Sequence, residues 1–314
     1  NYSTSTHLKD LSDKDMIIEA VFEELEVKKS VFSQLNDIAK EGAVLASNTS
    51  YLDIDKIASA TDRVGDVIGL HFFSPANIMR LLEIVVPTNV KDDVVATGFQ
   101  LAKILKKVPV RAGNCDGFIG NRVLENYAKA ANYMMEDGTS PYDIDKAIVE
   151  FGYPMGPFQM FDLAGGDIGW ADRKRKAAFR SNEERYVSIA DRICEKGWFG
   201  QKTGRGYYKY TPGARRGEED PEVLSIIQEE RNVKGIEAKS LSSDEIRRRY
   251  FAAMVNESAK VLEEKMALRP SDIDVTKLFG YGFPRHMGGP MRYADVYGIE
   301  NIPVSYTHLR AHET

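Results

Sequence analysis

Cysteine is scarce in this sequence, and long hydrophobic runs are absent. Its 314 residues include two cysteines, Cys115 and Cys194, which stand far apart and belong to no Cys-x-x-Cys pair or Cys/His ligand spacing. This pattern argues against a disulfide framework and a zinc site, and it fits a reducing compartment. No stretch approaches the roughly eighteen apolar residues of a membrane span. We predict a bacterial cytoplasmic protein with no membrane span and no metal site, and a peroxisomal location is the alternative.

Neither sign of charge dominates the composition. The chain has 42 Lys and Arg residues against 47 Asp and Glu, a formal net charge of −5. A protein with this balance is not expected to have nucleic acid as its main partner. With 43% hydrophobic residues, the chain is long enough for two or three globular units with cores of their own.

Short apolar runs alternate with amphipathic stretches over the first 112 residues. We expect strands at residues 15–21, 43–46, 67–72, 83–87 and 108–110, and helices at residues 26–39, 54–59 and 94–105. Strands that alternate with helices predict parallel βαβ units, and therefore an α/β fold with a doubly wound sheet of the Rossmann type. The Gly-x-Gly-x-x-Gly fingerprint of a dinucleotide-binding loop does not occur in the chain.

Helical patterns and an internal repeat follow Gly113. Helices are expected at residues 118–136, 141–149 and 244–265. Asp143-Ile144-Asp145 recurs as Asp272-Ile273-Asp274, and Phe151-Gly152-Tyr153-Pro154 is echoed by Tyr281-Gly282-Phe283-Pro284. We predict two related all-α domains that pack on each other, residues 113–212 and 241–303, joined by a linker at 213–240. The alternative is chance reuse of Gly/Pro turns.

Four polar residues stand at the edges of apolar runs: Ser50, His71, Glu83 and Asn121. Glu83 follows His71 on the next expected strand, so its carboxylate can hold one imidazole nitrogen and leave the other to face a substrate. A hydroxyl, an imidazole, a carboxylate and an amide are suited to taking a proton from an alcohol while a hydride leaves it. The alternatives are helix caps for Ser50 and Asn121 and a structural role for His71.

The order and spacing of these four residues resemble the 3-hydroxyacyl-CoA dehydrogenases of fatty-acid β-oxidation. The resemblance implies that NAD is the cofactor and an acyl-CoA thioester the substrate. It also implies that His71 takes the hydroxyl proton and that Glu83 orients and stabilises the imidazole. Ser50 is then expected to hydrogen-bond the 3-hydroxyl group, and Asn121 to polarise the thioester carbonyl.

The same resemblance implies a set of cofactor contacts. Glu23 and Lys28 are expected to line the nicotinamide side, Asn48 and Ser50 to lie against the nicotinamide and ribose, and Lys202 to lie near the cofactor. Ser74 stands where asparagine is usual in the family, which puts its cofactor contact in doubt. The alternatives are a solvated helical turn for Glu23 and Lys28 and an exposed loop charge for Lys202.

Both ends of the chain indicate a gene fragment. The chain begins at Asn1, and the resemblance makes residues 1–112 the C-terminal part of an NAD-binding domain whose glycine-rich loop lies upstream. Residues 304–314 match an in-frame translation of a transposase-type sequencing adapter, so this segment, with His308 and His312, is excluded from the fold prediction.

The tandem helical domains resemble multifunctional β-oxidation enzymes, in which a hydratase/isomerase domain precedes this region. We therefore expect a thiolase or a hydratase as a partner, and intramolecular pairing of the two helical repeats. One rival is a CoA-independent 3-hydroxy acid dehydrogenase, which would need an Arg or Lys for the free carboxylate. Another is a non-catalytic, crystallin-like relative, against which the intact Ser50, His71, Glu83 and Asn121 count.

Overall fold

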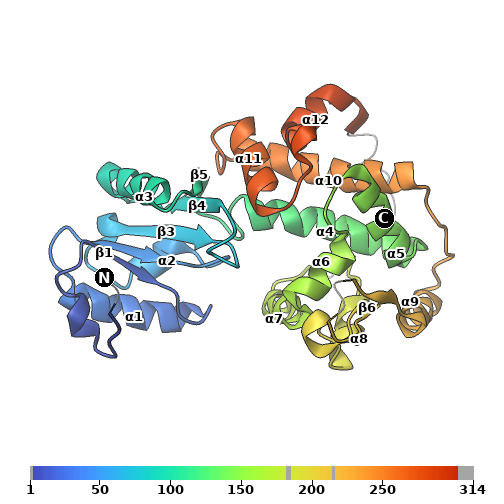
Figure 1. Cartoon of the computed structure of the whole chain (residues 1–314), viewed down its shortest axis with the longest axis horizontal. Helices are drawn as coiled ribbons and strands as arrows, with labels where there is room; N and C mark the ends of the chain where they lie inside the picture. The colour runs from blue at the N-terminus through green and yellow to red at the C-terminus, as the bar shows by residue number, and fades with distance from the viewer. Residues whose placement is uncertain (1–2, 182–184, 214–215, 303–314) are drawn as a thin grey trace. The chain divides into compact units, whose positions relative to one another are not determined.

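The computed structural model describes residues 3–181, 185–213 and 216–302. It divides into two compact units (Figure 1). Unit 1 is formed within Asn1–Leu124 and Glu257–Tyr293, and unit 2 within Glu125–Asn256 and Ala294–Thr314. The second helical segment, expected at 241–303 as a domain of its own, is therefore shared between the two units.

Unit 1 is built on a five-stranded sheet with the order β1-β2-β3-β4-β5. The strands are β1 Met16–Glu19, β2 Val44–Ser47, β3 Val67–Phe72, β4 Leu81–Val86 and β5 Val108–Gly113. The helices between them are α1 Leu25–Ile38, α2 Ile54–Ala58 and α3 Asp92–Ile104. Each expected strand and helix of this region is present, and its ends lie within three residues of the expected ones. The predicted fold class, a Rossmann-type α/β domain followed by helical structure, is confirmed.

One strand pair departs from the expected parallel arrangement. β1, β2 and β3 run parallel, as do β4 and β5, but β3 and β4 are antiparallel. The loop between β3 and β4 explains the difference, because a parallel crossover needs about a dozen residues or more, usually with a helix, and residues 73–80 are too few. The antiparallel register sets His71 directly opposite Glu83.

The two faces of the sheet bury different sets of residues. Ile68, Leu70, Leu82 and Ile84 form a core with Val94 and Ala102 of α3. Gly69 lies on the opposite face, where a methyl group would come within 2.7 Å of Val85 Cβ and 3.0 Å of Ile54 Cδ1 of α2. Because side chains alternate along a strand, His71 and Glu83 share the face of Gly69 and Val85.

A segment remote in sequence completes unit 1. Gly113 at the end of β5 donates a backbone hydrogen bond to Met266 O, at 2.7 Å. Helix α11, Pro270–Gly280, ends against β4, because a methyl group on Gly280 would lie 2.5 Å from Leu81 Cδ2. Leu81 is two residues before Glu83 and therefore on the same face of the sheet. The second helical copy thus packs beside the His71–Glu83 pair.

Unit 2 is mainly helical, and aromatic residues fill its core. Its helices include most of α4 (Gly120–Asp137) and of α10 (Ser243–Glu263), together with α5 Pro141–Phe151, α6 Pro157–Ala164, α7 Gly166–Ala177, α8 Ile189–Glu195, α9 Pro221–Lys234 and part of α12 (Pro290–Tyr297). The ring centroids of Tyr127 and Tyr250 lie 4.9 Å apart, and those of Phe151 and Phe251 4.2 Å apart. These contacts join the first helical copy to α10, as the expected pairing of the repeats requires.

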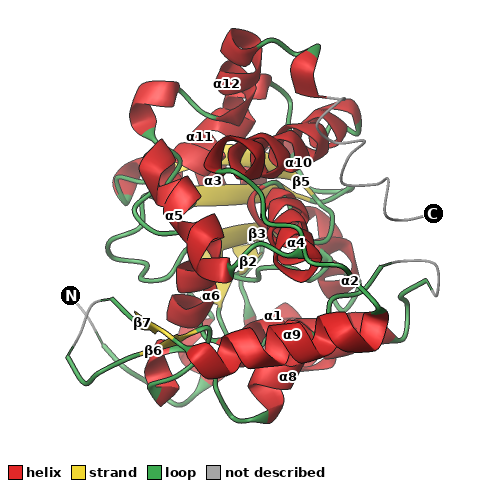
Figure 2. Cartoon of the chain, turned by 90° about the vertical axis from the view of Figure 1, so that its right-hand side faces the viewer, coloured by secondary structure: helices red, strands yellow, loops and turns green. Residues whose placement is uncertain are grey.

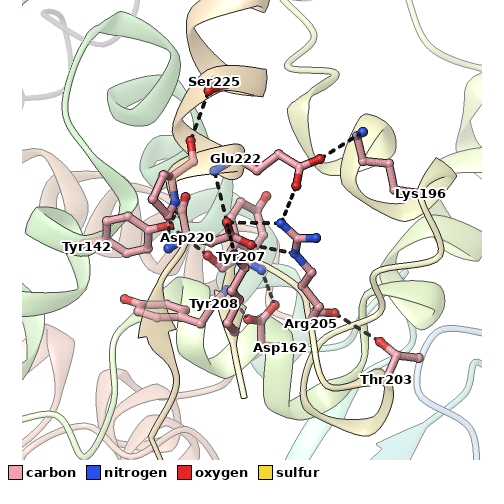
Figure 3. Close-up of polar contacts among 12 residues, drawn as sticks. Tyr142, Asp162, Lys196, Thr203, Arg205, Tyr207, Tyr208, Asp220, Glu222 and Ser225 are labelled. Atoms are coloured by element: carbon pink, nitrogen blue, oxygen red, sulfur yellow. Dashed lines mark hydrogen bonds and ion pairs between the residues drawn. The ribbon is translucent and has the colours of Figure 1, made fainter. Parts of the chain in front are cut away.

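The segment expected as a linker, residues 213–240, contains helix α9 (Figure 2). The prediction was wrong for residues 221–234, because α9 buries Val223, Ile226 and Ile227. Ion pairs fix the start of the helix in unit 2: the Arg205 guanidinium contacts Asp220 at 2.7 Å and Glu222 at 2.6 Å (Figure 3). Charged residues at the start of α9 are therefore engaged in ion pairs within unit 2.

The internal repeat has a structural counterpart. Asp145 accepts hydrogen bonds from Phe158 N and Gln159 N, in the first turn of α6, and Asp274 accepts them from Met291 N and Arg292 N in the first turn of α12. In each copy, the aspartate binds the start of a helix that opens with Pro after Gly. Carboxylates are favourable there because the first N–H groups of a helix lack partners within it.

Residues 304–314, the expected adapter segment, lie outside the described residues.

In the described parts of the chain, no helix combines the length and the apolar character needed to cross a membrane.

Candidate active site

His71 and Glu83 form a buried pair across the antiparallel strands β3 and β4. His71 Nδ1 lies 2.7 Å from Glu83 Oε2, and the two residues are 4% and 0% exposed. Directly opposed residues on one face of an antiparallel pair have their Cβ atoms only about 5 Å apart, which suits this contact. Because a carboxylate can only accept, Nδ1 carries the hydrogen and Nε2 is left with its lone pair for a substrate.

The second oxygen of Glu83 is held by backbone. Glu83 Oε1 accepts hydrogen bonds from Ile119 N at 3.2 Å and Gly120 N at 2.9 Å, where α4 begins. Both oxygens of the carboxylate thus face donors, and the start of a helix favours negative charge. Glu83 is fixed in position as a hydrogen-bond partner of His71.

The imidazole of His71 lies between aromatic rings. The centroid of Phe73 is 4.3 Å from that of His71, and the centroid of Phe118 is 5.7 Å away. These apolar neighbours restrict the rotation of the ring and its access to water. The pair therefore has the geometry of a base and its orienting carboxylate.

Ser50 and Asn121 meet beside this pair. Ser50 lies just after β2, at the carboxyl end of the sheet, and Asn121 is in the first turn of α4, next to Gly120. Asn121 Nδ2 donates to Ser50 O at 3.4 Å. Since Glu83 is bonded to Gly120 N, the four predicted catalytic residues lie in one region of unit 1.

Glu23 and Lys28 lie at the carboxyl end of β1 and in the first turn of α1. Glu23 Oε1 accepts hydrogen bonds from Thr49 Oγ1 at 2.6 Å and Ser50 N at 2.7 Å, so this carboxylate orders the loop that carries Ser50. Lys28 is fully buried, which excludes the solvated-turn alternative for it. Its Nζ lies 3.1 Å from Asn48 O and 3.6 Å from Glu23 Oε2.

Asn48, Ser74 and Lys202 have different surroundings. Asn48 Oδ1 accepts a hydrogen bond from Phe72 N at 3.0 Å, which ties the ends of β2 and β3 together. Ser74 is exposed, three residues after His71. Lys202 belongs to unit 2, where its ammonium pairs with Asp167 Oδ1 at 2.5 Å.

Comparison with known proteins assigns the family. Residues 1–115 match the family model of the 3-hydroxyacyl-CoA dehydrogenase NAD binding domain, and residues 117–210 match that of the C-terminal domain. The solved dehydrogenase part of multifunctional enzyme 1 from C. elegans is 32% identical with a TM-score of 0.67, over 98% of this chain and 69% of that chain. The chain belongs to the 3-hydroxyacyl-CoA dehydrogenase family.

Other members of the 3-hydroxyacyl-CoA dehydrogenase family differ in length from this chain. The structure of (S)-3-hydroxybutyryl-CoA dehydrogenase PaaH1 from Ralstonia eutropha is 33% identical with a TM-score of 0.61, over 66% of this chain and 74% of that chain. The peroxisomal bifunctional enzyme of Danio rerio is 44% identical over 310 residues, which are 95% of this chain and 43% of that protein. The chain thus spans less than half of the length of such curated relatives.

The NAD-binding character of the family can be tested on the residues at the carboxyl end of β1. Val21 is 42% exposed and Phe22 is 84% exposed, so apolar side chains are open to solvent in the segment that leads to Glu23. A nicotinamide carboxamide offers a flat apolar ring and an NH2 donor. Exposed apolar side chains in the same segment as a carboxylate therefore fit the nicotinamide end of NAD.

Sequence reasoning missed Glu19. It is 5% exposed at the end of β1, where its Oε1 accepts from Lys28 Nζ at 2.7 Å and its Oε2 from Ser47 Oγ at 2.7 Å. The available signal was a single carboxylate at the end of the apolar run Met16-Ile17-Ile18, because a buried carboxylate requires a partner. Glu19 is thus the main counter-charge of Lys28, which the sequence analysis assigned to the cofactor.

Lys277 of α11 was missed as well. It is fully buried, and its Nζ lies 3.4 Å from Gly120 O, the residue whose N–H holds Glu83. Burial lowers the pKa of Lys277 well below its ordinary value, and the negative charge of Glu83 acts in the opposite direction. Between the lowered pKa of Lys277 in the folded chain and its ordinary pKa in the unfolded chain, the unfolded chain binds more protons than the folded chain. The free energy of unfolding therefore rises with pH in this range.

We therefore expect Lys277→Met to raise the free energy of unfolding by about 1 kcal/mol or more at pH 7. Methionine has a shape similar to that of lysine, and the substitution removes the cost of desolvating a charged group. This advantage should shrink as the pH rises to about 10, because the lysine of the unfolded wild-type chain then loses its proton as well. Urea unfolding at several pH values measures it, with Lys103→Met at an exposed position as the control. A constant difference over this range would contradict the assignment of the desolvation cost to Lys277.

Proposed function

We propose that this chain catalyses the oxidation of (3S)-hydroxyacyl-CoA to 3-ketoacyl-CoA with NAD, a step of fatty-acid β-oxidation. The observation that carries the proposal is the buried His71–Glu83 pair, with its 2.7 Å contact, beside Asn121 and Ser50. Family membership supports it, because the matched family models describe a 3-hydroxyacyl-CoA dehydrogenase.

In the proposed mechanism, His71 Nε2 takes the proton of the substrate 3-hydroxyl group. Glu83, held by Ile119 N and Gly120 N, stabilises the imidazolium that results. The Ser50 hydroxyl hydrogen-bonds the same substrate oxygen, and the Asn121 NH2 group donates to the thioester carbonyl. NAD, when bound, supplies the acceptor for the hydride that leaves C3. In the reverse direction, the His71 imidazolium returns the proton.

Five further residues are proposed to act on the cofactor side. Glu23 and Lys28 would line the nicotinamide. Asn48 would lie against the nicotinamide and ribose, and Ser50 would lie there too, in addition to its contact with the substrate. Ser74 and Lys202 complete the proposed set. Support is strongest for Glu23, because it follows the exposed Phe22 in the chain and its carboxylate orders the Ser50 loop.

The setting of the activity follows from the relatives. Those of Danio rerio and Homo sapiens are named peroxisomal bifunctional enzymes, and one of Oryza sativa a peroxisomal fatty acid beta-oxidation multifunctional protein. We propose that this chain is the dehydrogenase part of a multifunctional enzyme with a hydratase activity, with thiolase as a functional partner. These names favour the peroxisome over the bacterial cytoplasm.

A substrate comparison tests the proposed function. The multifunctional enzyme that we propose contains this chain is incubated with NAD and (3S)-hydroxybutyryl-CoA, its (3R) enantiomer or free 3-hydroxybutyrate, and NADH formation is followed by absorbance. We expect oxidation of the (3S) thioester, with the (3R) thioester and the free acid at least about 100-fold slower, because a misplaced hydroxyl loses the general base. Equal rates with the free acid would favour the CoA-independent alternative, and no NADH from any substrate would contradict the proposal.

A further inference from the structure

The hydroxyl of Tyr281 contacts the amide of Asn121. Tyr281 follows α11, in the second helical copy, and its Oη lies 2.8 Å from Asn121 Oδ1. The two residues are 160 positions apart in the sequence, and both belong to unit 1. The other end of the same amide, Nδ2, lies 3.4 Å from Ser50 O. The Asn121 amide is thus held at both ends.

The chemistry of these contacts fixes the orientation of the amide. Ser50 O is a backbone carbonyl and can only accept a hydrogen bond, so the amide atom that faces it must be the NH2 nitrogen. The atom that faces Tyr281 is then the amide oxygen, which can only accept. Tyr281 must therefore donate its hydroxyl hydrogen to Asn121.

The Tyr281 ring is itself held from several sides. Gly120 leaves room for it, because a methyl group there would lie 2.3 Å from Tyr281 Oη and 2.5 Å from its Cε2. The Lys277 ammonium lies 3.6 Å from the ring centroid, and Phe73 packs edge-on with a centroid distance of 5.5 Å. Phe73 also packs on His71. A side chain with these neighbours has little freedom to rotate.

The first helical copy lacks this hydroxyl. The repeat aligns Tyr281-Gly282-Phe283-Pro284 with Phe151-Gly152-Tyr153-Pro154, so Phe151 stands in the place of Tyr281. Phe151 packs on Phe251 in the core of unit 2. The two copies therefore share a framework but differ at the position that reaches the site.

We infer that Tyr281 is a positioning residue of the active site: its hydroxyl holds the Asn121 amide oxygen and turns the amide NH2 group towards Ser50 and the substrate. The inference rests on the proposed function for the identity of the substrate group, a thioester carbonyl. The second helical copy then supplies part of the catalytic apparatus in addition to its packing role.

Tyr281→Phe tests this inference because it removes one hydroxyl and leaves the ring. The matched control is Tyr297→Phe, which removes the hydroxyl of a tyrosine that is 38% exposed in unit 2. In spectra of protein labelled with 15N-asparagine, the side-chain amide signals of Asn121, assigned by their loss in Asn121→Ala, should shift in Tyr281→Phe and stay in Tyr297→Phe. Unshifted signals in Tyr281→Phe would overturn the inference, whatever the substrate is.

Calorimetric titration with acetoacetyl-CoA gives the functional readout. We expect Tyr281→Phe to weaken binding about fivefold, the usual effect of one hydrogen bond, and to have no further effect in an Asn121→Ala background. An equal loss in both backgrounds, or no loss in either, would overturn the positioning role. A wild-type protein that does not bind the thioester would instead contradict the proposed function, and the amide signals would still decide the contact between Tyr281 and Asn121.

Discussion

His71→Gln is expected to lower kcat for the (3S)-hydroxyacyl-CoA by about 100-fold or more, as removal of a general base does. Glutamine can donate its NH2 group to Glu83 in place of Nδ1, so the buried carboxylate keeps a partner. The glutamine side chain has no atom that can take a proton at neutral pH. The loss should therefore appear in kcat and little in the thermal midpoint.

The control for this variant is His286→Gln. His286 is exposed and lies in the second helical copy, so its replacement should leave kcat unchanged. Steady-state rates and thermal midpoints of both variants are the measurements. A His71→Gln enzyme with wild-type turnover would mean that another group takes the proton.

Glu83→Gln is expected to lower kcat by about 100-fold or more as well, for a different reason. Ile119 N and Gly120 N both donate to Glu83 Oε1, so the glutamine oxygen will take that side. The glutamine NH2 group then faces His71 Nδ1 and donates to it. The hydrogen of the imidazole moves to Nε2, and the nitrogen that should accept the substrate proton is blocked.

A tautomer change can be separated from a general loss of structure. The 15N chemical shifts of His71 should show hydrogen on Nδ1 in the wild type and on Nε2 in Glu83→Gln. The matched control is Glu125→Gln in α4, a carboxylate that pairs with Lys176 at the surface of unit 2. If Glu83→Gln kept both the Nδ1–H tautomer and normal turnover, Glu83 would have no orienting role.

The His71–Glu83 pair could be predicted from the sequence because both residues lie on short strands that are close in the chain. Apolar runs showed the two strands, and the place of Glu83 on the strand after that of His71 indicated that the residues could meet. The predicted direction of β4 was wrong, since the apolar pattern of a six-residue run does not depend on the direction of the strand in the sheet. Only the short connection at residues 73–80 carried that information.

Residues held by long-range contacts could not be predicted in the same way. Lys277 and Tyr281 reach the site through the packing of α11 on β4. They lie about 160 residues after Gly120 and Asn121 in the sequence. Local pattern assigned them to the second repeat and gave no sign of a contact with the site. Helix α9 was missed because the Pro, Gly and charged residues just before it, at 211–220, indicated a linker, although the apolar residues of the helix have helical spacing.

The central claim is that His71 and Glu83 act as one unit in proton transfer. The most direct test is the kcat of the double variant His71→Gln/Glu83→Gln beside the two single variants. If Glu83 acts only through His71, the double variant loses no more than His71→Gln alone, since there is no imidazole left to orient. A loss equal to the product of the two single losses would show that the residues act independently and would contradict this account.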